Sequence, residues 1–274
     1  MLDIPDYLYH YTSIETLAFI LKYKTIRFNR LDFVDDPEES MTGDLGVFGR
    51  FCFVSCWTSM AEESIPMWHM YSKNMRGVRI KLPIFPFKEY IHRPHSQKWT
   101  KKDEVVEECN EYGKETYTSY IDLDYFFQKN CSTVPLKENI LASVIYTTDE
   151  KLIFPHLLEK TERGVNIHIN KLGIYKRKYW EFQQELRYKI FVSPFGPDDI
   201  VDATPEKIND IAQRYITNTL PFNDIFLFLD DNKFRDMEIR LGPKVSDAEK
   251  IIVDSLVKEY NSSARVTKSV LNIK

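Results

Sequence analysis

The sequence is poor in glycine, in excess basic charge and in long apolar runs, and each shortage excludes a class of protein. With 9 glycines in 274 residues, the chain has no Rossmann-type or Walker-type phosphate loop. Its formal net charge of −4 argues against constitutive nucleic-acid binding, which draws on surplus Lys and Arg. No apolar run approaches the roughly 20 residues of a membrane span, so no membrane partner is predicted.

Export signals and metal-binding motifs are also lacking. The first residues, MLDIPDYLYH, have no basic segment followed by an apolar core, so we expect a cytoplasmic protein with reduced cysteines. Cys52 and Cys56 lie in the strand-like FCFVSCW without C-x-x-C spacing or a second pair, and they resemble core residues more than zinc ligands. No metal is expected. The G-x-S-x-G and H-E-x-x-H motifs of common hydrolases are absent as well.

The chain is rich in material for a core, at 43% hydrophobic and 14% aromatic residues. Apolar spacing predicts a helix over 13–23, opened by Thr12 and Glu15 in a capping-box pattern. Further helices are expected at 98–108, 156–171 and after Ser246, and strands at 51–57, 77–82 and 186–192, with 77–82 returning as a hairpin onto 51–57. Without strict βαβ alternation, these elements predict an α+β fold. No linker divides the chain, which favours a single domain over 1–274 with an insertion at 83–135.

His10 stands at the end of a predicted first strand, directly before the first helix. A neutral imidazole both donates and accepts hydrogen bonds, which suits a ribose hydroxyl or an amide. A half-buried histidine bonded to backbone explains the position equally simply. Thr12 and Ser13 could meet an anion at the helix N-terminus, or they could only cap the helix.

Glu185 and Arg187 flank Leu186 in the block WEFQQELR. Alternation along a strand places the two charges on one face, with Leu186 turned toward the core. There a carboxylate could stabilise positive charge at an anomeric carbon, and the arginine could bind phosphate or hold the carboxylate. A surface ion pair of small energetic value is the alternative. Asp36 and Glu39 are interpreted as turn residues.

The blocks LYHYTSIETLAFILKYKTIRFNRLDFVDDPEE, FVSCWT, ESIPMWHMYS with GVRIKL, KRKYWEFQQELRYKIF and EIRLGPK together resemble the bacterial domain-of-unknown-function family 2971, found in mobile and phage-defence settings. The resemblance runs from about residue 8 to residue 260. Asp35 departs from it, since the family usually has Asn before Asp-Pro. That family in turn resembles ADP-ribosyltransferases, which implies a split two-sheet α+β core with helical insertions and NAD as the substrate.

The resemblance assigns roles to particular residues. His10 and Thr12 would hold the adenine-side ribose or the nicotinamide amide, and Glu185 would be the catalytic glutamate that binds the nicotinamide ribose. Ser55 would match the middle strand, although it stands in no Ser-Thr-Ser triplet. A ring near the nicotinamide would come from Tyr71 or Tyr11.

The sequence therefore predicts an NAD-dependent ADP-ribosyltransferase-like protein, a toxin or phage-defence effector with a protein or nucleic-acid acceptor. Two alternatives stay open. One is a catalytically inactive ligand-sensing or protein-interaction domain of a defence system, and the other is a nucleotide-processing hydrolase that uses Glu185. The oligomeric state and the acceptor are not specified by any motif.

Overall fold

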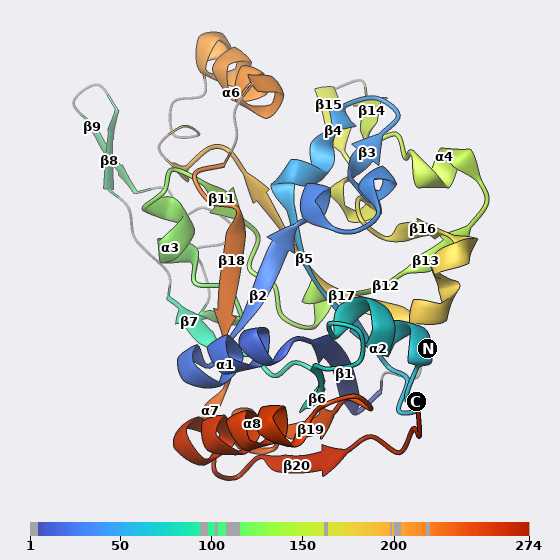
Figure 1. Ribbon diagram of the computed structural model, residues 1–274. Helices are drawn as coiled ribbons and strands as arrows, with labels where there is room; N and C mark the ends of the chain where they lie inside the picture. The colour runs from blue at the N-terminus through green and yellow to red at the C-terminus, as the bar shows by residue number, and fades with distance from the viewer. Residues whose placement is uncertain are drawn as a thin grey trace.

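The computed structural model describes residues 5–93, 98–101, 104–107, 116–161, 164–197, 199, 204–217 and 220–273. Within these ranges the largest feature is a ten-stranded mixed sheet (Figure 1). Its main path runs in the spatial order β11 (Ser132–Thr133), β17 (Glu185–Ser193), β5 (Cys52–Thr58), β1 (Tyr7–Thr12), β6 (Val78–Pro83), β19 (Glu238–Leu241) and β20 (Arg265–Lys268). Off this path, β12 (Leu141–Ser143) pairs with β17, and β2 (Thr25–Arg30) pairs with β5 and with β18 (Asp224–Phe228).

Short two-stranded sheets decorate this core. They are β3 (Met41–Thr42) with β4 (Gly46–Val47), β7 (Tyr90–His92) with β10 (Tyr117–Ser119), β8 (Lys98–Lys101) with β9 (Glu104–Glu107), β13 (Ile145–Thr147) with β16 (Tyr175–Arg177), and β14 (Leu158–Thr161) with β15 (Gly164–Ile167). The α-helices are α1 (Ile14–Tyr23), α2 (Ile65–Tyr71), α3 (Leu123–Phe127), α4 (Glu150–Ile153), α6 (Pro205–Thr217), α7 (Asp231–Arg235) and α8 (Asp247–Tyr260). The 3₁₀ turns that bear on the site are η2 (Pro37–Ser40) and η7 (Lys178–Gln183).

Helix α1 forms where the apolar spacing predicts it, but its cap is one residue later than expected. Ser13, not Thr12, is the N-cap, and its hydroxyl accepts a hydrogen bond from the Thr16 N–H. Thr12 is still part of β1 and is buried. A strand residue keeps its backbone paired with the neighbouring strand, so the first residue free to adopt the capping conformation is Ser13.

Helix α8 carries the capping box that Ser246 and Glu249 predict. It lies beside α1 at the lower edge of the molecule in Figure 1. The inner faces of both helices join one hydrophobic core with the apolar residues of β1, β6 and β19, including Leu17, Val253, Leu8, Ile80 and Ile239. This face of the sheet is therefore sealed by helices.

The other face of the sheet carries polar residues in register. One cross-strand row runs from β17 to β20 through Glu185, Thr58, Tyr9, Lys81, Glu238 and Arg265. The next row includes Tyr11, Arg79, Arg240 and Thr267. Since alternate residues of a strand share a face, both rows project on the same side of the sheet.

Three predicted elements are wrong. Strand β6 pairs with β1 and β19, so β1 lies between it and β5, and the expected hairpin does not exist. Residues 156–171 do not form the expected helix but include the hairpin of β14 and β15. The alternation of apolar and polar residues in GVNIHI favours a strand there. Residues 98–101 and 104–107 form the paired strands β8 and β9 in place of the expected helix at 98–108. Residues 102–103 and 108 lie outside the described ranges.

The mixed sheet and its separate helices make the fold α+β, as the sequence predicts. Where it is described, the predicted insertion at 83–135 holds β7, β8, β9, β10, α3 and β11; residues 94–97, 102–103 and 108–115 lie outside the described ranges. The helices in the described ranges include none with the length and apolar character needed to cross a bilayer.

Candidate functional site

Glu185 and Arg187 share one face of β17, as predicted, but that face is closed. Glu185 is 6% exposed and Arg187 is 0% exposed. Arg187 Nε donates to Glu185 Oε1 at 2.8 Å, and its Nη1 donates to the Gly173 carbonyl at 2.9 Å. The expected open side and the expected surface ion pair are therefore both wrong, because the pair lies in the interior.

Two further charges complete this buried cluster. Glu39, from η2, receives a hydrogen bond from Arg187 Nη1. Lys176, from β16, lies 2.9 Å from Glu185 Oε2 and 3.1 Å from Glu39 Oε1. Two carboxylates and two cations are formally neutral together, which is the usual condition for burying charge. We call Glu39, Lys176, Glu185 and Arg187 the charge cluster.

The two carboxylates of the charge cluster differ in protonation behaviour. Burial alone would raise the pKa of Glu185, but the charges of Arg187 and Lys176 outweigh it and hold that pKa below the usual range. For Glu39, burial dominates over the same two cations and raises the pKa. Glu185 is thus the firmly ionised member, and both of its oxygens are occupied by cations.

A chain of hydrogen bonds leads from the charge cluster toward the surface at α2. Lys176 Nζ donates to Gln183 Oε1 at 2.8 Å, and Gln183 Nε2 donates to Tyr71 Oη at 2.5 Å. Burial, helped by the charges of Asp35 and Glu185, raises the pKa of Tyr71, so its phenol stays protonated. The predicted residues Glu185, Arg187 and Tyr71 are therefore brought into one connected network.

His10 is not part of that network. Its Nδ1 lies 2.8 Å from the Cys56 carbonyl oxygen, and its ring centroid lies 5.0 Å from that of Trp57. Trp57 pairs with Leu186 in register, so it projects from the face opposite to Glu185. Burial lowers the pKa of His10, despite the bond to Cys56, and keeps the ring neutral. The backbone-bonded histidine is the arrangement found.

The remaining predicted residues are dispersed. Ser55 is buried on the Trp57 side of β5 and accepts a hydrogen bond from the indole of Trp57 at 3.0 Å. Tyr11 projects on the polar side, where its ring packs edge-on against Trp68 at 4.8 Å and its hydroxyl accepts from the Ser64 N–H. Their strands are neighbours, but the side chains do not converge on one point with His10 and Glu185.

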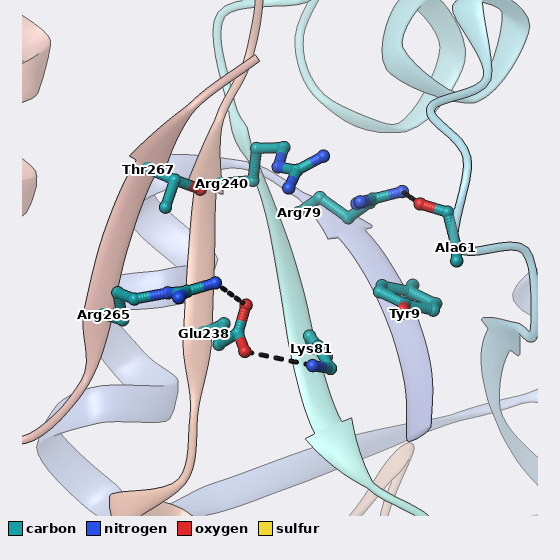
Figure 2. Close-up of a pocket in the computed structure, with 8 residues that line it drawn as sticks. All are labelled: Tyr9, Ala61, Arg79, Lys81, Glu238, Arg240, Arg265 and Thr267. Carbon is teal, nitrogen blue, oxygen red and sulfur yellow. Dashed lines mark hydrogen bonds and ion pairs between the residues drawn. The ribbon is translucent and has the colours of Figure 1, made fainter. Parts of the chain in front are cut away.

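An open site lies on the polar face of the sheet, away from the charge cluster. It is a hollow of about 280 Å³, which we call the basic hollow, and Figure 2 shows the side chains that line it. It is lined by Tyr9, Ala61, Arg79, Lys81, Glu238, Arg240, Arg265 and Thr267. Glu238, one of these lining residues, bridges Lys81 and Arg265, each at 3.0 Å. Charged residues alternate with apolar ones in GVRIKL and EIRLGP, and this pattern indicates that the charged side chains of β6 and of β19 share one face of the sheet.

Arg79 is the most unusual residue of the basic hollow. It is 4% exposed, yet in the described ranges no carboxylate pairs with it. Its Nη1 donates instead to the carbonyls of Ala61 and Glu62 at 2.9 and 3.1 Å, and its guanidinium lies 4.5 Å from the centre of the Tyr9 ring. The guanidinium of Arg79 is therefore held by backbone carbonyls and an aromatic ring.

Arg79 also stands directly opposite Arg240 in the pairing of β6 with β19. Figure 2 shows the two side chains on neighbouring strands, with the Arg79 guanidinium extending toward Ala61. Arg240 is paired with Glu63 at 3.1 Å, whereas in the described ranges no carboxylate pairs with Arg79. Like charges at paired positions of neighbouring strands are destabilising, so the site favours one further anion beside these arginines.

No protein-family model, curated protein or solved structure matches this sequence. Within the described ranges, no group of three or more His, Cys, Asp or Glu is placed to hold a metal ion. The function is therefore argued from the geometry of the charge cluster and the basic hollow.

Proposed function

We propose that this protein binds a small phosphorylated molecule of the nucleotide class in the basic hollow and acts as a ligand-sensing domain. The observation that carries the proposal is the in-register pair Arg79 and Arg240. A phosphate bridging the two guanidinium groups would turn their repulsion into two charge-assisted interactions.

The charge balance of the basic hollow favours an anion. Four basic side chains line it, and within the described ranges the carboxylates that pair with them are Glu238 and Glu63. Among the described residues, two positive charges are therefore left uncompensated. This local excess contrasts with the net charge of −4 for the whole chain, so it is a feature of the site.

The rest of the lining suits a nucleotide more than a bare ion. The Tyr9 ring lies at one side of the basic hollow (Figure 2), and a base or ribose can pack against such a ring. Thr267 on β20 adds a hydroxyl at the opposite side. The hollow thus combines a cationic centre, an aromatic wall and a neutral hydrogen-bonding group.

Calorimetric titration with ADP, NAD and pyrophosphate tests the proposal on the wild type, Arg79→Gln and Arg265→Gln. A hydrogen bond to a charged group contributes about 1.5–3 kcal/mol, so Arg79→Gln should weaken binding by about 10- to 150-fold. Arg265 is exposed, so its replacement tests the site without disturbing the interior; it should weaken binding by severalfold. The matched control is Arg27→Gln on β2, which removes an exposed arginine outside the basic hollow.

Binding of none of the three ligands, or equal affinities for wild type, Arg79→Gln and Arg265→Gln, would refute the proposal. Affinity should also fall steeply between 50 and 200 mM salt, and less steeply in both hollow variants than in the Arg27→Gln control, because fewer phosphate charges are neutralised.

ADP-ribosyl transfer from NAD is the second candidate, and one observation favours it. The strands of Glu185, Ser55 and His10 are consecutive in the sheet, in the order β17, β5, β1. Glu185 and Lys81 belong to the same cross-strand row, about 14 Å apart by strand spacing, a span that a dinucleotide can bridge. This activity would require an ADP-ribosyltransferase-like core and release of Glu185 from Lys176 and Arg187.

Nicotinamide release from NAD separates the two candidates. Transfer or hydrolysis predicts release by the wild type and a loss of about 100-fold or more in Glu185→Gln, because the carboxylate would stabilise the developing cation. Tight NAD binding without release by either form would leave the ligand-sensing function and remove the transferase.

A further inference from the structure

The loop before α2 contains a buried carboxylate that ties together three parts of the chain. The Glu63 side chain is 1% exposed. Its Oε2 accepts from Trp68 Nε1 at 2.9 Å and from the Ser269 hydroxyl at 2.5 Å. Its Oε1 accepts from the Val270 N–H at 2.9 Å and from Arg240 Nη1 at 3.1 Å. Glu63 therefore binds α2, the segment after β20 and the basic hollow at once.

The segment after β20, residues 269–273, lies across α2. In Figure 1 the chain rises from β20 toward α2. Its Leu271 and Ile273 pack against a small second core that contains Tyr11, Met67 and Trp68. Tyr71 and Phe182 border the same core, and Tyr71 is the outer end of the hydrogen-bond chain from the charge cluster. We call residues 269–273 the strap.

Arg240 is shared between the strap's anchor and the basic hollow. It lines the hollow, and in the described ranges it is the cation that pairs with Glu63. Burial alone would raise the pKa of Glu63, but the bonds from Ser269, Val270 and Trp68 and the charge of Arg240 hold that pKa below its usual range. The ionised carboxylate therefore depends on its donors and on Arg240 together.

We propose that docking of the strap and binding of a phosphorylated ligand in the basic hollow compete for Arg240, so that the ligand releases the strap. The proposal rests on the proposed ligand-binding function. A phosphate that draws Arg240 toward Arg79 leaves Glu63 buried without its cation, which is an unfavourable state. Release of residues 269–273 exposes Glu63 to water and removes that cost.

Reciprocity gives the proposal a second consequence. If the ligand weakens docking of the strap by some factor, then full release of the strap must tighten the ligand by the same factor, and partial weakening by up to that factor. Release would also uncover part of the second core that contains Met67 and Trp68 of α2, because Leu271 and Ile273 pack against it. Ligand occupancy would thereby change the exposure of apolar residues on α2.

Hydrogen exchange and calorimetry with ADP test this on the full chain. ADP should speed exchange of the Val270 N–H by about fivefold or more, the lower end of typical coupling factors. Ser269→Ala removes one bond to Glu63 and should bind ADP about fivefold more tightly than the wild type. The matched control is Ser255→Ala, since Ser255 is exposed on α8 and donates to the Ile251 carbonyl.

The outcomes separate the two proposals. Unchanged or weaker ADP binding by Ser269→Ala, with Val270 exchange unaffected by ADP, would overturn the strap while leaving ligand binding in place. Failure of ADP to bind any form, including wild type, would overturn both. Equal tightening in Ser255→Ala and Ser269→Ala would also count against the strap, because the Ser255 hydroxyl bonds to the Ile251 carbonyl of its own helix and not to Glu63.

Discussion

Replacement of Arg187 by Met tests the account of the charge cluster. The guanidinium is fully buried and serves both Glu185 and Glu39. Met fills a similar volume but leaves two buried carboxylates with Lys176 as their remaining partner. Removing one member of a buried ion pair costs about 3–5 kcal/mol, since the other charge stays in the interior.

Urea unfolding followed by tryptophan fluorescence measures this loss. Domains have a free energy of unfolding of about 5–15 kcal/mol, so Arg187→Met should lose a large part of the total. For a chain of 274 residues, the midpoint of thermal unfolding should fall by roughly 5–9 °C. The exposed control Arg27→Met breaks a pair with Asp224 and should cost about 0–1 kcal/mol.

A double variant shows whether charge is the cause. Arg187→Met combined with Glu39→Gln again leaves a neutral cluster, with Lys176 facing Glu185 at 2.9 Å. It should recover at least about half of the lost free energy, a coupling of more than about 1.5 kcal/mol. A loss below about 1 kcal/mol in Arg187→Met, or no recovery in the double variant, would refute the reasoning.

Two further predictions concern the opening of the chain. Burial lowers the pKa of His10 in the folded chain, so the unfolded chain binds the proton more readily. The contribution of His10 to the free energy of unfolding should therefore be complete above pH 6.5 and fall as the pH drops below that value. His10→Phe should flatten this pH dependence in urea titrations between pH 7.5 and 5, and an unchanged slope would contradict the burial argument. Ser13→Ala should lower the free energy of unfolding by about 1 kcal/mol through loss of the α1 cap, whereas no loss in thermal unfolding would return the capping role to Thr12.

Local structure was predictable from the sequence where one segment determines it. The apolar spacing of α1 and the capping box of α8 depend on residues within a few positions of each other. The place of β6 does not, because the pairing of β6 with β1 and not with β5 depends on contacts distant in sequence. For the same reason alternation predicted the common face of Glu185 and Arg187 without revealing what covers it.

The partners of the charge cluster could not be found by motif. Glu39 was interpreted as a turn residue, and it does lie in a 3₁₀ turn whose first cap is Asp36. Its burial follows from the packing of η2 against β16 and from the hydrogen bond that Glu39 accepts from Arg187, and no local pattern reports either. The basic hollow was partly predictable from the sequence. Alternation in β6 and β19 places their charged residues on one face of each strand, namely Arg79, Lys81, Glu238 and Arg240. Only the order of strands brings them together.

A crystal structure of the ADP complex is the most direct test of the central claim, that the in-register arginines of β6 and β19 form a phosphate site. The account predicts phosphate oxygens within about 3 Å of the guanidinium groups of both Arg79 and Arg240. Phosphates bound elsewhere on the molecule, or in the basic hollow without contact to either arginine, would contradict it.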